Sequence, residues 1–480
     1  MNIIVIVIDT LRYDYVGANG NAGIRTPNID RLAGRSWRFD RSFAASFPTI
    51  PHRTDLMTGR YGGPFHPWLP LRHEVPTLPW ALAEAGYATQ LIHDTPHLVN
   101  GGHNFDWPFH AWTFVRGAEV DRPWITSSTD YPDNWAGDPL FDLIEGDPLK
   151  LNVMHTYVRA NRSRKKPEDW NAAKLFSAAA EFLHDNAARD KFFLWVDCFD
   201  PHEPWDAPPE FVKMYDDTPG YDGRIDPRAF LVRSQPDLPE AVVKRVRALY
   251  AAKVSWMDHC LGKLLDALDE TGLWEKTAVI FTSDHGTRLY EHGAFGKGHP
   301  QLEEVAHTPY FICVPGAGTG RSDLIVQPQD VFATACALGG ATVPDGIDSR
   351  DVLAIAREGK GSPRDIALTS VRADRWRGHH DETLFTAYDA EWCLEFRLKA
   401  EDCILTRLGS MENVAGENAD VVARLHAGAL NEVERRGAHP ALMAWLRSAG
   451  EKPFPKSCRF FDGWPGPGGF QAYFLRLCHD

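Results

Sequence analysis

The sequence predicts an α/β fold: a doubly wound, mostly parallel central sheet flanked by helices, with a small C-terminal α+β subdomain. Three continuous apolar segments predict the sheet, at residues 3–9 (IIVIVID), 192–198 (FFLWVDC) and 277–286 (TAVIFTSDHG). Runs of this kind are typical of strands covered on both faces. Helical patterns separate them, and alternation of strand and helix favours a parallel sheet between layers of helices.

The elements can be justified in chain order. Residues 3–8 form the first strand, which leaves Asp9 at its C-terminal end. Apolar residues at helical spacing then lead into the second strand; they are Ala172, Leu175, Phe176, Ala179, Phe182 and Leu183. A long helix is predicted over residues 239–270, ended by Thr271-Gly272 before the third strand.

Two stretches depart from this alternation. Residues 101–170 are rich in Trp, Asp and Pro, including Trp107, Trp112, Trp124 and Trp135, and we expect an insertion that covers the site. Residues 363–480 contain short strand-like pieces and a helix near 418–436, which predicts the small subdomain after a catalytic domain at 1–362. The aromatic and glycine-rich tail, residues 461–480, is expected to pack on a neighbouring subunit of a homo-oligomer.

Composition excludes several classes of function. With 51 basic and 65 acidic residues and a net charge of −14, the chain has no basic block to bind a nucleic acid polymer. The N-terminus has no cationic leader and its apolar run is too short to span a membrane, so we expect cytoplasmic residence. The eight cysteines are scattered without a CxxC pair, which favours free buried thiols over disulfides.

Acidic residues end the predicted strands. Asp9 follows the first, Asp197 or Asp200 the second, and Asp284 with His285 the third, and ligands gather at this edge of such sheets. Each residue has a plainer alternative, because Asp284 could cap a helix beside a solvated His285 and Asp9 could pair with Arg12. Neighbouring carboxylates repel unless a cation compensates them, so convergence of Asp9 and Asp284 would imply a metal site.

The segment SFPTIPHRTDLMTGR, residues 46–60, gives a more specific indication. It resembles the signature of the sulfatase family within the alkaline phosphatase superfamily: Cys or Ser, any residue, Pro, Ser, Arg, then Leu and Thr-Gly-Arg. Thr49, Pro51, Arg53, Leu56 and residues 58–60 match in position. Further matches in family order lie at residues 7–21, 25–33, 78–89, 199–205, 283–286, 291–298, 308–316 and 326–348.

The resemblance implies roles for individual residues. Asp9, Asp284 and His285 would hold one divalent metal with the nucleophile Thr49, and Thr10 is a further candidate ligand. Arg53, His202 and Lys297 would bind a small anionic ester or assist its leaving group, with His299 and His292 as further candidates. Oxygen-rich ligands with one His suit Ca, Mg, Mn or Zn, and a second ion would need ligands such as Asp200, His202 and His299. His52, His259 and His307 are expected to be packed or solvated.

Several positions depart from the family pattern. Thr10 stands where many sulfatases have a second metal-binding Asp, and residues 91–98 (LIHDTPHL) lack a family Lys that His93 or His97 could partly replace. The largest departure is Thr49, because sulfatases oxidise the signature Cys or Ser to formylglycine, and Thr is not a substrate for that maturation.

Threonine changes the predicted chemistry. A Thr hydroxyl near a metal can form a covalent ester that water then cleaves, a route that suits phosphoryl better than sulfuryl groups. The sequence therefore predicts a hydrolase of phosphodiesters or phosphonate monoesters that acts through phospho-Thr49. The alternatives are a sulfatase without formylglycine and a catalytically dead homologue that binds carbohydrate. A transferase is less favoured, since such relatives are commonly membrane anchored.

Overall fold

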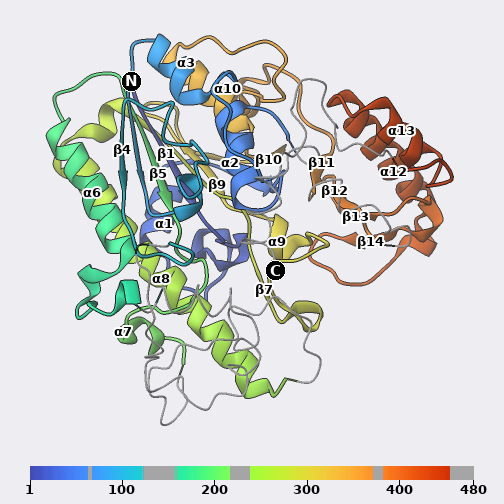
Figure 1. Ribbon diagram of the computed structural model, residues 1–480, viewed down its shortest axis with the longest axis horizontal. Coiled ribbons are helices and arrows are strands. Elements are labelled where there is room, and N and C mark those ends of the chain that lie inside the picture. The colour runs from blue at the N-terminus through green and yellow to red at the C-terminus, as the bar shows by residue number, and fades with distance from the viewer. Residues whose placement is uncertain are drawn as a thin grey trace. The chain divides into compact units, whose positions relative to one another are not determined.

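A computed structural model describes residues 1–62, 68–121, 123, 157, 159–216, 238–370 and 382–454. The chain divides into two compact units, each treated by itself below. Unit 1 is Met1–Arg38, Leu82–Lys297 and Pro309–Gly320, and unit 2 is Phe39–Ala81, Gly298–Thr308 and Arg321–Asp480. Figure 1 traces the elements along the chain.

An eight-stranded sheet organises the chain. Its order is β10 (Gly320–Val326), β2 (Trp37–Ser42), β9 (Tyr310–Cys313), β6 (Thr277–Ser283), β1 (Asn2–Ile8), β5 (Phe192–Cys198), β3 (Ala88–His93) and β4 (Ala111–Phe114). The strands from β6 to β4 pair in parallel, whereas β9 is antiparallel to both β6 and β2. The predicted fold class, a mostly parallel sheet flanked by helices, is confirmed.

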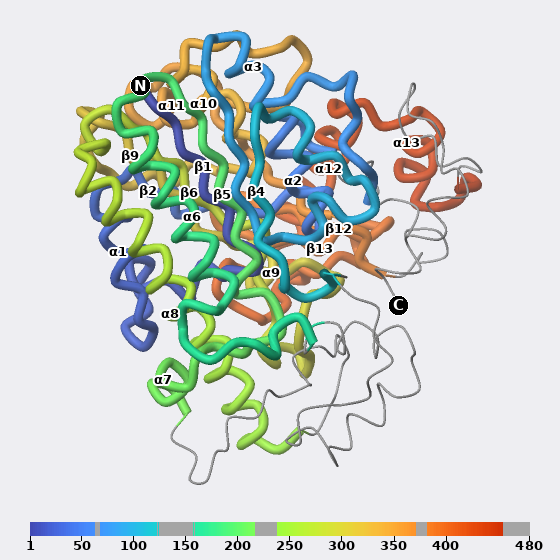
Figure 2. Tube along the Cα trace, turned by 60° about the vertical axis from the view of Figure 1, so that its left-hand side comes forward, coloured from blue at the N-terminus to red at the C-terminus, as the bar shows by residue number. Residues whose placement is uncertain are grey.

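The burial of β1 explains why the continuous apolar segments form strands of the sheet. All seven of its residues are buried, and Ile4, Ile6 and Ile8 pack in one core with side chains of the helices α6 (Asn171–Asp185) and α8 (Glu240–Glu270). Figure 2 shows these two helices on one face of the unit 1 strands. The predicted helix over 239–270 is α8, which ends before Gly272 in the left-handed conformation at φ 67°.

The other regular elements of the described residues are all shorter than α8. The helices are α1 (Pro27–Ala33), α2 (Thr49–Thr58), α3 (Leu78–Glu84), α7 (Pro209–Val212), α9 (Glu303–Ala306), α10 (Asp330–Gly339), α11 (Val352–Glu358), α12 (Ala419–Arg435) and α13 (Pro440–Arg447). A two-stranded ribbon joins β7 (Arg288–Leu289) to β8 (Phe295–Gly296). Single 3₁₀ turns occupy Tyr13–Tyr15, Gly17–Asn19, Pro96–Leu98, Pro167–Asp169, Leu273–Lys276, Glu291–Gly293, Ala400–Asp402 and Ala415–Glu417.

Unit 2 contains the small antiparallel sheet expected near the C-terminus. Its order is β11 (Ala367–Thr369), β12 (Phe385–Tyr388), β13 (Trp392–Phe396) and β14 (Ile404–Arg407). Leu394 and Phe396 of β13 pack with Leu425 of α12 and Leu442 of α13 in one apolar core. The helix expected near 418–436 is α12. The boundary at residue 362 stays a prediction.

Several expectations concern residues outside this description. Of the predicted insertion, residue 122, residues 124–156 and residue 158 lie outside it, Trp124 and Trp135 among them, and so does the tail at 461–480. The six cysteines within the described ranges are free and buried, as predicted: Cys198, Cys260, Cys313, Cys336, Cys393 and Cys403. Among the described residues, no helix has the length and apolar character needed to cross a membrane.

Candidate metal centre and nucleophile helix

The strand ends of unit 1 bring three predicted metal ligands together. Ile8 and Ser283 are partners in the parallel register of β1 and β6, so the residues that follow them, Asp9 and Asp284, emerge at the same edge. One ligand atom each from Asp9, Asp284 and His285 lies within 4.8 Å of the others, and all three residues are buried. The convergence on which a metal site depends is therefore present.

Short hydrogen bonds orient the two carboxylates. Asp284 Oδ1 accepts from the backbone N–H of Thr10 at 2.9 Å and from that of His285 at 2.7 Å. The Thr10 hydroxyl donates to Asp9 Oδ1 at 2.6 Å. Thr10 thus supports the acidic pair from its backbone and its side chain, and its role as a metal ligand stays a prediction.

The imidazole of His285 has a fixed orientation. Its Nδ1–H donates to the carbonyl of Gly286 at 2.9 Å, which fixes the tautomer, and Nε2 lies 3.5 Å from Asp284 Oδ2. Two carboxylates and a neutral imidazole form a donor set that fits a divalent cation. Two buried carboxylates this close would repel each other without a cation, so the residues fit the metal that the sequence implies.

The turn after β1 is anchored by α8. Thr10 has φ 63°, a strained value for a β-branched residue, and its carbonyl accepts from the Tyr250 hydroxyl at 2.7 Å. The same hydroxyl accepts from the N–H of Arg12 at 3.1 Å. The Arg12 guanidinium pairs with Asp14 at 2.7 Å and with Glu291 at 2.8 Å, so this side chain has two carboxylate partners besides any role at Asp9.

His202 and Lys297 lie in an acidic setting. His202 Nδ1–H donates to the carbonyl of Glu203 at 2.8 Å, and its ring stacks on Phe199 with 4.1 Å between centroids. The Lys297 ammonium donates to Glu203 Oε2 at 2.7 Å, and Glu119 Oε2 lies 3.5 Å from His202 Nδ1. Burial, and secondarily the charge of Lys297, lowers the pKa of His202 well below its usual value.

The two glutamates were not anticipated from the sequence. Burial, helped by the charges of Glu203 and Asp9 and opposed by Lys297, raises the pKa of Glu119 to about 8. Glu203 could have been found, because it follows His202 directly in FDPHEPW. Glu119 stands in a polar segment after β4, and no pattern there indicates a site residue.

Asp197 in β5 and Asp200 after it have other partners. Asp197 accepts from the Thr95 hydroxyl at 2.6 Å and from the Trp195 indole at 3.3 Å. Asp200 pairs with Lys253 at 3.0 Å. Within the described ranges, the group able to hold a metal contains neither aspartate.

In unit 2, α2 begins at Thr49. Thr49 is 3% exposed and Arg53 fully buried, and their spacing of four residues places both on one face of the helix. Backbone N–H groups at a helix N-terminus favour negative charge, which suits a residue that carries an anionic group.

A buried carboxylate holds both ends of α2. Asp55 Oδ2 accepts from the N–H of Ser46 at 2.9 Å, and Oδ1 accepts from the N–H of Gly62 at 2.7 Å. Burial raises the pKa of Asp55 to about 7, although these hydrogen bonds oppose the shift. The segments before Thr49 and after the helix are thus tied to one side chain.

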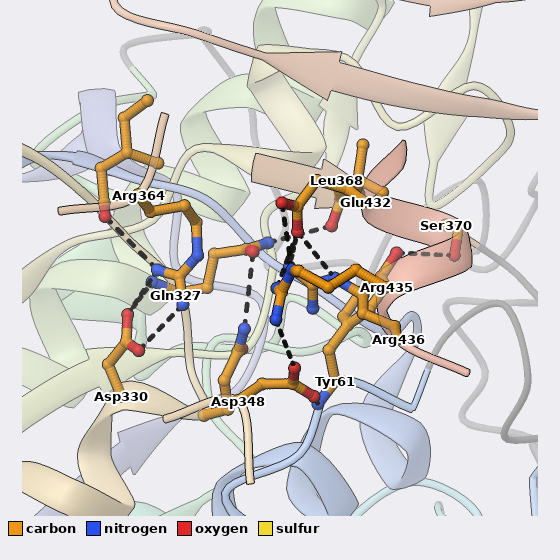
Figure 3. Close-up of polar contacts among 12 residues, drawn as sticks. Tyr61, Gln327, Asp330, Asp348, Arg364, Leu368, Ser370, Glu432, Arg435 and Arg436 are labelled. Atoms are coloured by element: carbon orange, nitrogen blue, oxygen red, sulfur yellow. Dashed lines mark hydrogen bonds and ion pairs between the residues drawn. The ribbon is translucent and has the colours of Figure 1, made fainter. Parts of the chain in front are cut away.

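The chain beyond α2 is fixed by the network in Figure 3. The N–H of Tyr61 donates to Asp348 Oδ2 at 3.1 Å, its hydroxyl lies 3.1 Å from Ser370 Oγ, and the Arg436 guanidinium lies 4.1 Å from the centre of its ring. Arg364 binds Asp330 through two hydrogen bonds, at 2.6 and 2.9 Å. Contacts from three segments therefore immobilise the end of the signature.

The remaining histidines differ in setting. His299 is exposed and its Nε2 hydrogen-bonds to the carbonyl of Thr383, while His292 is exposed with φ 54°. Their roles in a site stay predictions. His307 donates to the carbonyl of Asp40 at 2.9 Å, and His259 is exposed beside Trp256, as expected for packed or solvated residues.

His93 and His97, the two histidines expected to replace the family Lys in part, are in unit 1. His93 is buried, with Nδ1 3.1 Å from the carbonyl of Thr95 and its ring stacked on Phe114. His97 packs edge-on against Phe199, the residue on which His202 stacks.

Comparison with known proteins identifies similar chains. The family model described as Sulfatase matches residues 1–341. An arylsulfatase from Clostridium perfringens is 26% identical over 76% of this chain and 80% of its own length. The multifunctional alkaline phosphatase superfamily protein PehA from Trinickia caryophylli is 26% identical over 75% of this chain and 78% of its own. A phosphonate monoester hydrolase structure from Silicibacter pomeroyi superposes with a TM-score of 0.69 at 22% identity, covering 91% of this chain and 95% of that one.

Proposed function

This chain belongs to the sulfatase family, and from that premise we propose that it hydrolyses phosphodiesters or phosphonate monoesters with Thr49 as its nucleophile. Membership of the family makes it an ester hydrolase. The choice of phosphorus over sulfur is the proposal, and it is carried by one observation: threonine at the signature position.

Threonine limits the way in which the covalent intermediate can break down. A sulfated formylglycine hydrate expels sulfate by reforming an aldehyde, but a threonine ester has no such exit and must be attacked by water at the central atom. In the proposed reaction, Thr49 Oγ bonds to phosphorus, the bond to the leaving oxygen breaks, and that oxygen gains a proton. Water then attacks phosphorus, the bond to Oγ breaks, and the hydroxyl regains its proton.

Asp9, Asp284 and His285 are the residues that would hold the metal. A divalent cation there would act as a Lewis acid that stabilises negative charge on the reacting oxygens. Thr49 belongs to the other compact unit. Its assignment to the same reaction therefore rests on the family order of the motifs.

The chain's own cations would bind the ester. Arg53 lies one helical turn from Thr49 and offers a guanidinium suited to two oxygens of a phosphoryl group. Lys297 would contact a non-bridging oxygen. His202 is neutral at rest because its pKa is lowered; it would contact the leaving oxygen through Nε2 after gaining a proton, a form that the nearby anionic ester favours. The hydrogen bonds of His202 and Lys297 to the Glu203 carbonyl and carboxylate fix both side chains in advance of binding.

A sulfatase that works without formylglycine is the second candidate. It is favoured by the similarity to the arylsulfatase from Clostridium perfringens. The phosphonate monoester hydrolase from Silicibacter pomeroyi supports the fold alone at its level of identity.

Turnover on matched 4-nitrophenyl esters tests the proposal: a phosphodiester, a phosphonate monoester, a phosphomonoester and a sulfate, with the metal-reconstituted enzyme. We expect the diester or phosphonate to be preferred, and Thr49→Ala to lower kcat by about 10³-fold or more. Thr49→Ser keeps a hydroxyl and should retain most activity. Thr54→Ala removes a hydroxyl from the same helix, where it donates to the Ile50 carbonyl at 2.9 Å, and serves as the control. Sustained sulfate release as the fastest reaction would replace the proposal with the second candidate.

A further inference from the structure

A lysine is buried in the middle of the longest helix of unit 1. The side chain of Lys253 in α8 is 3% exposed. Its ammonium lies 3.0 Å from Asp200 Oδ1 and 2.5 Å from Asp206 Oδ1. Desolvating a lysine is costly, so it stays charged in such a place only where carboxylates compensate it.

The two aspartates bracket the residues that carry His202. Asp200 comes two positions before His202 and Asp206 four positions after it. The loop from 200 to 206 is braced internally, because the Trp205 indole donates to the carbonyl of Pro201 at 3.0 Å. One ammonium group therefore joins both ends of the loop to α8.

Asp206, at the end of the loop, has further contacts. The Arg164 guanidinium lies 2.7 Å from Asp206 Oδ2, and the Trp170 indole donates to the Asp206 carbonyl at 2.8 Å. Burial opposes ionisation of Asp206, but Lys253 and Arg164 lower its pKa nevertheless. Asp200 has Lys253 as its ion-pair partner within the described residues. Lys253 is thus the cation that pairs with Asp200, the aspartate closer to His202 in the sequence.

We propose that Lys253 is a positioning residue for His202: its ammonium holds the loop 200–206 in the conformation that presents the imidazole to the ester. The inference rests on the proposed function, in which His202 assists the leaving group. Lys253 is bound to both aspartates and acts on the reaction only through the loop.

A double-mutant cycle with a series of leaving groups tests the inference. Lys253→Met removes the charge and keeps the length of the side chain. We expect it to lower kcat by about 10- to 100-fold for a phosphodiester with an alkyl alcohol as leaving group, and by much less for 4-nitrophenolate, which needs little assistance. His202→Ala should show the same dependence on the leaving group. In the His202→Ala background, Lys253→Met should change kcat by less than about threefold, since interacting residues are not additive. Lys263→Met is the matched control, because Lys263 lies on the same helix and bonds at the surface to Ser177.

The outcomes separate this inference from the function on which it rests. An equal loss from Lys253→Met in both backgrounds would show that Lys253 does not act through His202. If His202→Ala leaves the alkyl diester reaction unchanged, the role of His202 in the proposed function is wrong, and an effect of Lys253→Met would then overturn the positioning role as well. A loss in His202→Ala without one in Lys253→Met would overturn the inference alone.

A milder variant covers the case in which Lys253→Met does not fold. Asp200→Asn leaves Lys253 paired with Asp206 and releases the tie beside His202. It should reproduce the dependence on the leaving group with a smaller loss of kcat, while circular dichroism and the midpoint of thermal unfolding report the fold. A folded Asp200→Asn variant with unchanged kcat for every leaving group would contradict the proposal that Lys253 holds the loop 200–206 through Asp200.

Discussion

The strand-end group of unit 1 and helix α2 of unit 2 hold their key side chains by different means. Asp9 and Asp284 continue two paired strands, and the backbone N–H of Asp284 still donates to the carbonyl of Ile8 at 3.2 Å. Helix α2 has no strand ladder, and Asp55 ties its flanking segments instead. Ligand positions in unit 1 therefore follow from main-chain pairing, whereas the position of Thr49 depends on a few side chains. Function should be the more sensitive readout in the first region, and stability in the second.

The largest effect is expected from Asp284→Asn. Asn keeps an oxygen that can accept from Thr10 and His285 but removes a charge from the metal ligands, so metal affinity should fall by about 100-fold or more and activity by about 10³-fold, with the fold intact. Metal content after dialysis and turnover at rising metal concentration measure both. Asp197→Asn is the control, because Asp197 also ends a strand but bonds to Thr95 and Trp195. If the Asp284→Asn variant retains the metal content of the wild type, Asp284 is not a metal ligand.

Asp55→Asn should also have a large effect, on stability. Near pH 5 Asp55 is protonated, and its carbonyl and hydroxyl oxygens can still accept from the N–H groups of Ser46 and Gly62. The NH₂ group of Asn cannot accept and faces one of these N–H groups, so we expect a loss of about 2–3 kcal/mol. Denaturant unfolding measures this free energy. Activity at saturating metal tells whether Thr49 moves as well.

The pH dependence of that loss has a definite sign. The pKa of Asp55 is raised from 3.8 to about 7 in the folded chain, so the folded state binds the proton more tightly and stability falls as pH rises through this window. Asn does not titrate, and the gap between wild type and Asp55→Asn should narrow between about pH 4 and 7, by up to about 1.4 kcal/mol per pH unit. A gap that stays constant above about pH 5 would mean that Asp55 is already ionised in the folded chain and that its pKa is not raised.

The sequence was informative where local pattern determines position. Continuous apolar runs predicted β1 and β6, and parallel pairing then required Asp9 and Asp284 to meet. The long helix and the C-terminal strands were predicted on the same kind of pattern.

Other features depend on contacts between residues far apart in the chain. Lysine side chains on helices are normally solvated, but Lys253 in α8 is buried. The aspartates that it binds, Asp200 and Asp206, lie about fifty residues earlier in the chain. Glu119 has no periodic context, and the role of Asp55 requires the two loops beside α2 to approach the helix. Such pairings arise from tertiary packing, which no local pattern in one sequence encodes.

Two glycines that end helices, Gly59 in unit 2 and Gly272 in unit 1, allow the packing in the two regions to be compared. Gly59, after α2, and Gly272, after α8, both have φ 67°. A Cβ at Gly59 would lie 2.9 Å from Phe332 Cγ, whereas at Gly272 nothing lies within 4 Å. Each change to Ala costs about 1 kcal/mol for the left-handed backbone, and Gly59→Ala should lose about 1–3 kcal/mol more through overpacking. Thermal unfolding of both variants gives the difference, and equal losses would show that the residues around Gly59 can relax.

The smallest expected effect tests the turn that presents Asp9. Tyr250→Phe removes the hydroxyl that accepts from Arg12 N–H and donates to the Thr10 carbonyl, and leaves the ring packed. Stability should fall by about 1 kcal/mol, and metal affinity by about 10-fold, because the strained turn at Thr10 loses its tie to α8. Calorimetric titration of the metal-free protein with Mn²⁺ or Zn²⁺ measures the affinity, with Tyr215→Phe as control, since that hydroxyl contacts Ser255 and the backbone of Arg25. If stability falls while the affinity for both ions stays at the wild-type value, the strand ladder alone positions the ligands and the turn contributes nothing to the metal centre.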